Sequence, residues 1–157
     1  MWVGPFAVLV IVAVHLLFVA ERSMRQGELM FLIIVGLFGM LADTGLGVLG
    51  ATRYPSSEAA WPFVFVPPFI TSLWVLFATL PHHSLSWLRG RPVLAVVFGM
   101  IGGPLSFMAG TRFGAVGVGD SAVLTYGSLA IEYGVVMPLL LSLSMRRDVS
   151  PNGANEQ

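Results

Sequence analysis

Long apolar runs alternate with short polar segments along almost the whole chain. A hydrocarbon core of about 30 Å needs roughly 20 apolar residues of helix to cross it, and each run approaches that length. The pattern therefore predicts an all-α polytopic membrane protein, a bundle of five transmembrane helices in one domain over residues 1–147. Residues 148–157 lack apolar periodicity, and we expect them to form a disordered cytoplasmic tail. The predicted spans are Trp2–Ala20, Leu29–Gly50, Trp61–Leu80, Val93–Ala109 and Ala122–Leu143.

Arginines are concentrated on one side of this predicted bundle. Loops rich in basic residues stay on the cytoplasmic side of a membrane. The distribution therefore predicts an N-terminus outside and a C-terminus in the cytoplasm. One side carries Arg22, Arg25, Arg89, Arg91, Arg146 and Arg147, and the other side carries only Arg53 and Arg112.

The composition excludes several kinds of chemistry. Hydrophobic residues make up 56% of the chain and charged residues 10%, against about 25% charged residues in soluble domains. The formal net charge is zero, so we expect no nucleic-acid partner. Cysteine and lysine are both absent, which excludes disulfides, thiolate metal sites and Schiff-base chemistry. The three histidines are too few for a multi-histidine iron site. We therefore expect no metal and no cofactor, and a single metal ion at His82 or His83 is the alternative.

Small residues recur on one face of two of the predicted helices. Membrane helices pack through such faces, because lipid tails are as apolar as leucine and offer no hydrophobic driving force. We therefore predict that the second and fourth helices pack inside the bundle, and the glycines by themselves need serve only packing. The stripes are Gly36, Gly39, Asp43, Gly47 and Gly50 in the second helix, and Gly99, Gly103, Ser106 and Gly110 in the fourth.

Prolines fall inside three of the predicted spans. Each proline removes a backbone donor and clashes with the preceding turn, so we expect these helices to be bent or interrupted. Such breaks can serve packing, a cavity or a hinge. The prolines are Pro67 and Pro68 in the third helix, Pro104 in the fourth and Pro138 in the fifth.

Two carboxyl groups lie at membrane depth, Asp43 in the second span and Glu132 in the fifth. A charge at mid-bilayer costs at least about 2.5–3.5 kcal/mol, so such groups face the bundle interior, pair with a partner or stay protonated. We expect Asp43 to pair with Arg112, whose long side chain can reach down from the outer end of the fourth helix. Asp43 is then either a buried structural anchor or a site for a headgroup, an ion or a proton. Ser106 on the glycine face and His83 complete the predicted polar site.

Three segments resemble a known family. They are Phe77–Pro92, Gly99–Gly110 with the following Gly114–Val116, and Gly39–Asp43. Together they resemble small bacterial inner-membrane proteins grouped as domain of unknown function 2878. The resemblance maps the family's acidic residue onto Asp43 and favours His83 over His82, because the family pattern has Asn where this chain has His82. Glu132 has no counterpart in that pattern.

The resemblance implies no established activity, but it implies a location in the bacterial inner membrane. Family members are often encoded near cyclopropane-fatty-acid-synthase-like enzymes and flavin oxidoreductases, which implies a link to lipid modification. A first hypothesis is therefore a non-catalytic membrane partner of such an enzyme, with membrane lipids as further partners. Trp87, Arg89 and Arg91 would then contact the membrane surface.

Two other functions fit the same residues. A small transporter or permeation protein would use Asp43 and Glu132 as intramembrane carboxyl groups. Five spans cannot divide into two equal repeats, and assembly into a homo-oligomer would remedy this. An intramembrane lipid-modifying enzyme would need His83 beside Asp43, whereas the predicted topology places them in opposite halves of the bilayer.

Overall fold

The computed structural model describes the chain except residues 1–2, 16, 18–24, 55–65, 83 and 149–157. Within the described residues the chain is mostly helical, which confirms the predicted all-α class. The described residues also form two very short strands and two single turns of 3₁₀-helix. The main helices are α1 (Val3–Val14), α2 (Arg25–Val48), α3 (Pro68–Thr79), α4 (Pro92–Arg112) and α5 (Ala122–Asp148). The shorter elements are β1 (Thr52–Arg53), η3 (Leu80–His82), η4 (Ser86–Leu88) and β2 (Gly117–Val118).

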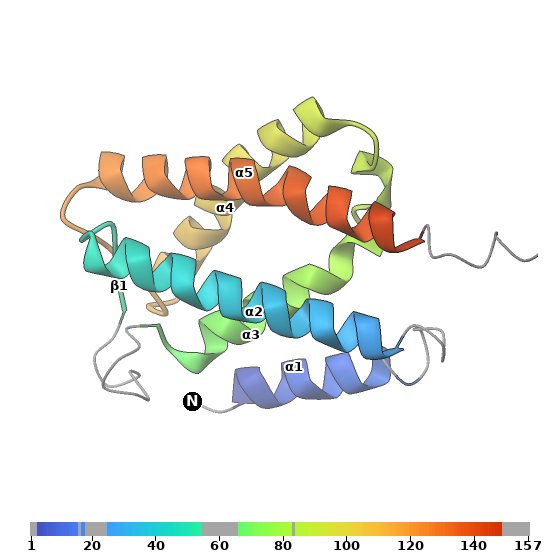
Figure 1. Cartoon of the computed structure of the whole chain (residues 1–157). Coiled ribbons are helices and arrows are strands. Elements are labelled where there is room, and N and C mark those ends of the chain that lie inside the picture. Colours follow the sequence, from blue (N-terminus) through green and yellow to red (C-terminus); the bar gives the residue numbers. More distant parts are fainter. Residues whose placement is uncertain (1–2, 16, 18–24, 55–65, 83, 149–157) are drawn as a thin grey trace, which may run out of the picture.

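Consecutive helices run in alternate directions between two ends of the bundle (Figure 1). One end of the bundle, which we call the β end, contains the end of α2, the starts of α3 and α5, and both strands. In the view of Figure 1, α2 lies between α1 and α5, and α4 crosses α5 obliquely. The predicted tail lies outside the described residues apart from Asp148, which ends α5.

In the described part of the chain, three helices are long and apolar enough to cross a membrane, namely α2, α4 and the part of α5 from Ala122 to Met145. This indicates a membrane protein. The helices α1 and α3 have 12 residues each. At 1.5 Å per residue they extend about 18 Å, short of the roughly 30 Å of a hydrocarbon core. Five crossings therefore remain a prediction.

The prolines interrupt none of the described helices. The helix α3 begins at Pro68, with Pro67 directly before it, so this pair starts the helix instead of bending it. Proline suits a first turn because its fixed φ is already helical and its missing N–H needs no partner there. Pro104 and Pro138 lie inside α4 and α5, each of which is one continuous helix. The predicted interruptions of these two helices are therefore not found.

The glycine stripe of α2 lies against α3. A Cβ at Gly36 would lie 2.8 Å from a methyl group of Val75, and a Cβ at Gly39 would overlap the indole of Trp74. Leu32, Val35 and Trp74 belong to the main core, to which α1 and α5 also contribute. Gly47 is half-buried in the last turn of α2, where its carbonyl accepts the amide of Gly50.

The helix α4 does not lie inside the bundle, contrary to our expectation. Its buried residues are Ala95, Gly99 and Gly103. Gly99 and Gly103 contact Tyr133 of α5, and Pro104 is half-buried. The rest of the helix is largely exposed and apolar, as expected for a surface that faces lipid. A glycine stripe identifies the face by which a helix contacts a neighbour. A helix at the edge of the bundle needs only one such face, so the stripe does not show that the helix lies inside.

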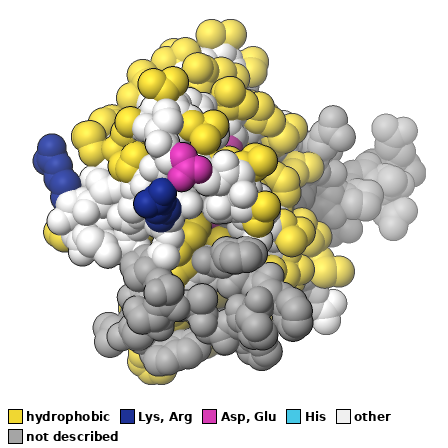
Figure 2. Space-filling view, turned by 90° about the vertical axis from the view of Figure 1, so that its left-hand side faces the viewer, with side chains coloured by type: hydrophobic (Ala, Val, Ile, Leu, Met, Phe, Trp, Pro, Cys, Tyr) yellow, Lys and Arg dark blue, Asp and Glu magenta, His cyan; other side chains and the backbone are white. Residues whose placement is uncertain are grey.

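Each end of the bundle is held by its own polar contacts. At the β end, β1 pairs antiparallel with β2, and Arg53 forms an exposed ion pair with Asp120, with an N–O distance of 2.9 Å. Figure 2 views this end and shows a basic and an acidic side chain together among mostly non-hydrophobic atoms. At the other end, Nε2 of His15 lies 3.3 Å from the Glu28 carboxylate, and both residues are buried. His15 thus contacts a neighbouring helix through its ring nitrogen.

The close contact between α2 and α3 can be tested at Gly39. The substitution Gly39→Ala should lower the free energy of unfolding by about 1–3 kcal/mol, because the added methyl group overpacks a buried contact. Gly45→Ala on the same helix is the matched control, since a Cβ there meets nothing within 4 Å. Unfolding in detergent micelles, followed by circular dichroism, measures both variants. Equal stabilities of the two would contradict the packing described above.

Candidate functional site

The carboxylate of Asp43 is the centre of a buried polar cluster. Trp74 of α3 donates its indole N–H to Oδ2 at 2.6 Å, and Tyr54 donates its hydroxyl to Oδ1 at 3.1 Å. Asp43 is only 5% exposed, so these two donors replace the water that a carboxylate needs. Each oxygen has one donor, which is the arrangement of a structural anchor.

Trp74 is held in place on several sides. Its ring stacks on Tyr133 of α5, with centroids 5.3 Å apart and planes 23° from parallel. Phe38 and Phe77 contact it edge-on, and Gly39 lies directly against the ring. The indole therefore connects α2, α3 and α5 at one point, and its N–H is directed at Asp43.

Tyr54 reaches Asp43 because it follows β1 directly. Burial, and then the negative charge of Asp43, raise the pKa of the Tyr54 hydroxyl well above its usual range. The hydroxyl therefore keeps its proton at neutral pH and remains a donor. The position of this donor depends on where the β end holds β1.

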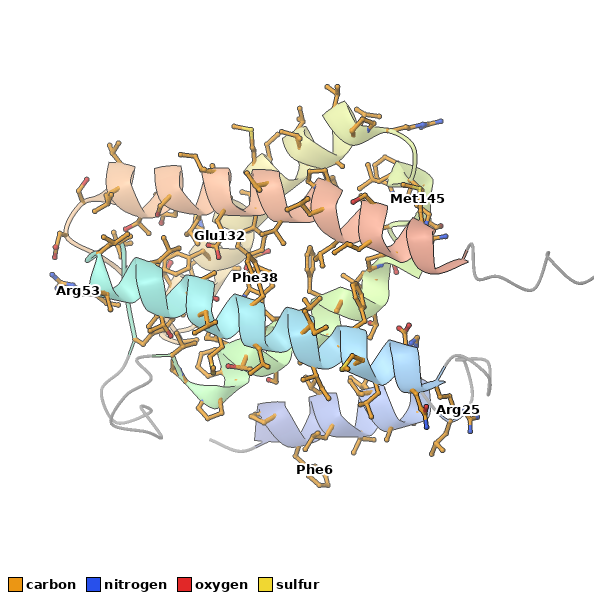
Figure 3. The ribbon with its side chains drawn as sticks, in the orientation of Figure 1. Phe6, Arg25, Phe38, Arg53, Glu132 and Met145 are labelled. Atoms are coloured by element: carbon orange, nitrogen blue, oxygen red, sulfur yellow. The ribbon has the colours of Figure 1, made fainter. Side chains whose placement is uncertain are left out.

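Glu132 is the second carboxyl group of the cluster and differs sharply from Asp43. Figure 3 shows it on the side of α5 that faces α2. Both of its carboxylate oxygens are buried and have no hydrogen-bond partner among the described residues. It lies within electrostatic range of Asp43, so the two groups repel each other when both are ionised. The site thus combines one satisfied carboxylate with one that lacks a described partner.

Two residues that we predicted for the site lie elsewhere. The expected ion pair of Asp43 with Arg112 is not found: the described partners of Asp43 are Trp74 and Tyr54, and Arg112 is exposed at the end of α4. Neutral donors serve the carboxylate at lower cost than a second buried charge would. Ser106 is also exposed, on a part of α4 that lies away from the contact made by Gly99 and Gly103 with α5.

His83 lies outside the described residues, so its predicted role is not tested. Trp87 in η4 and Arg91 shortly after it are both exposed, as contact with a membrane surface would require. Arg89 is half-buried and donates its Nε–H to the Pro81 carbonyl at 3.0 Å, which fixes the turn between α3 and α4. Within the described residues, no group of three or more histidine, aspartate or glutamate side chains lies close enough to hold a metal ion.

Sequence reasoning missed Trp74, Tyr54 and Tyr133. Each is an aromatic residue in or beside an apolar run, and residues of this kind in a membrane protein are most often packing or interface residues. The available signal was the pairing requirement itself, since a buried carboxylate needs donors and Trp74 is an N–H donor inside a predicted span. That signal does not identify which donor is the partner.

Comparison with known proteins identifies a family. A family described as Protein of unknown function (DUF2878) matches residues 1–139 of the chain. No curated protein matches significantly, and no solved structure does. The comparison therefore agrees with the resemblance seen in the sequence and adds no activity.

The anchoring of Asp43 can be tested by removing one donor. The substitution Trp74→Phe keeps an aromatic ring but leaves Oδ2 of Asp43 without its indole donor, which should cost about 1–3 kcal/mol of stability. Trp87→Phe is the matched control, because Trp87 is exposed and its change should stay within about 0.5 kcal/mol. A double-mutant cycle with Asp43→Ala, which removes both acceptor oxygens, isolates the pairwise contribution when measured by unfolding in micelles. A coupling energy near zero would contradict the anchor.

Proposed function

The chain belongs to the DUF2878 family, which carries no assigned activity, and from its site we propose a small permeation protein that binds a proton at intramembrane carboxyl groups. In this proposal Glu132 binds and releases the proton, and Asp43 supplies a fixed negative charge nearby. We propose a multi-pass protein with its N-terminus outside and its C-terminus in the cytoplasm, in the inner membrane of a bacterium.

One observation carries the proposal: both oxygens of Glu132 are buried without a described partner. A buried polar group without a partner is rare in native structures and calls for an explanation. An isolated carboxylate at membrane depth is costly, and a bound proton or cation removes that cost. The charge of Asp43 adds to the cost of ionising Glu132, because the two carboxylates repel each other.

Asp43 suits a fixed charge better than an exchanging one. Its two donors, Trp74 and Tyr54, both favour the carboxylate form, and releasing either would leave a buried donor unpaired. The division of roles therefore follows from the contacts: one carboxylate is saturated, and the other is available for a proton.

The proposal predicts proton movement that depends on Glu132. Purified protein reconstituted in liposomes with a trapped pH-sensitive dye should acidify the interior under a potassium-diffusion potential. The substitution Glu132→Gln should reduce the rate to that of protein-free liposomes, because the amide cannot exchange a proton. Asp148→Asn is the matched control, since this residue ends α5 at the end of the bundle opposite the β end and should leave the rate unchanged. A wild-type rate equal to that of protein-free liposomes would contradict the proposal.

A second candidate function rests on the end of the bundle that carries η4. Trp87 and Arg91 are exposed there, and a tryptophan beside an arginine is typical of a membrane–water interface. This surface favours contact with anionic lipid headgroups, as a non-catalytic partner of a cyclopropane-fatty-acid-synthase-like or flavin-dependent enzyme would need. Unchanged fatty-acyl chains in a strain that lacks the gene would count against this candidate and leave the first one untouched.

A further inference from the structure

A polar stripe on α5 leads from the β end to Glu132. Thr125, Ser128 and Glu132 are spaced by three and four residues, which places them on one face of the helix. Thr125 is fully buried in the first turn, and the half-buried Ser128 donates its hydroxyl to the Thr125 carbonyl at 3.0 Å. This stripe gives α5 a polar face that runs from the β end to Glu132.

Backbone contacts between two loops cover the start of the stripe. The hydroxyl of Thr125 donates to the Ala51 carbonyl at 2.5 Å and accepts the Gly119 amide at 3.0 Å. The Asp120 amide donates to the Gly50 carbonyl at 2.8 Å. These bonds tie the loop after α2 to the loop before α5, and the pairing of β1 with β2 extends the same contact. We call this set of contacts the buckle.

Glycine is required where the two loops touch. A Cβ at Gly119 would overlap the Gly50 and Ala51 backbone, so any side chain there would force the loops apart. Gly50 has a positive φ of 71°, which only glycine adopts readily. The buckle therefore depends on close backbone approach and not on side-chain packing.

The buckle also positions Tyr54. This residue follows β1 directly and donates to Asp43, so parting β1 from β2 would move one of the two donors of the site. Two-residue strands are marginal, and the Arg53–Asp120 pair, with side chains 66% and 67% exposed, adds little. Parting the loops therefore means breaking the hydrogen bonds of the buckle and one short strand pairing, all of which lie at the β end.

We propose that the buckle is a closure that controls access from the β end to Glu132 along the Thr125–Ser128 stripe. Closed, as in this structure, it covers Thr125 at the start of the stripe and holds Tyr54 on Asp43. Opening separates β1 from β2 and exposes Ser128 to water. The inference rests on the proposed role of Glu132 for its purpose, but its geometry can be tested independently.

The test uses the natural absence of cysteine. A single cysteine introduced as Ser128→Cys is labelled in liposomes with a membrane-impermeant maleimide, in two backgrounds. Gly119→Ala should force the buckle open, because the added methyl group overlaps the facing backbone. We expect the labelling rate to rise about tenfold or more, since a factor of ten corresponds to a free-energy cost near the lower end of those known for overpacked buried contacts. Gly127→Ala is the matched control, because it adds the same methyl group next to the labelled position where nothing lies within 4 Å. Equal rates in the two backgrounds would overturn the closure.

A second pair of variants keeps the test decisive if Gly119→Ala does not fold. Thr125→Val removes the hydroxyl that joins the two loops, whereas Thr125→Ser retains it. Faster labelling in Thr125→Val, restored to the slow rate in Thr125→Ser, supports the closure, and equal labelling overturns it. The two proposals can fail separately. If the labelling pattern is as expected but no Glu132-dependent proton flux is measured, the proposed function is rejected and the closure still holds.

Discussion

The hydrogen bond from Trp74 to Asp43 is the constraint on which the rest of the bundle depends. It joins the short helix α3 to α2, and it requires Gly39 beneath the indole and Tyr133 stacked above it. Apolar packing between membrane helices is not directional, because lipid competes for the same surfaces. The indole N–H of Trp74 and the carboxylate of Asp43 must meet at hydrogen-bond distance, which selects one arrangement of α2 and α3. The stacking of Trp74 on Tyr133 adds α5 to this arrangement.

The two carboxyl groups show how environment divides roles between chemically similar side chains. Asp43 has a neutral donor on each oxygen, whereas Glu132 has no described partner. The first arrangement stabilises a charge, and the second leaves a group whose charge must be balanced by something that binds. This chain therefore presents, in Glu132, one residue at which we expect binding chemistry.

The β end links this site to the surface. Its contacts are mainly between backbone groups, so they depend on close approach at Gly119 and Gly50. The same loops carry Tyr54, which reaches into the bundle, and Thr125, which starts the polar stripe of α5. Surface and interior are thus mechanically connected through a few residues at one end.

The sequence by itself determined the helical class, the positions of α2, α4 and α5, the two buried carboxyl groups and the contact faces of the glycine stripes. These features are local, because hydropathy and helical spacing are properties of one segment. Only the tertiary structure decided that Asp43 bonds to Trp74 and Tyr54 and not to Arg112, that α4 lies at the edge, and that β1 pairs with β2. Each of these depends on which segments meet in space, and a stripe or a donor in the sequence does not name its partner. Pro67 and Pro68 show the same limit, since proline can bend a helix or begin one and the surrounding packing decides which.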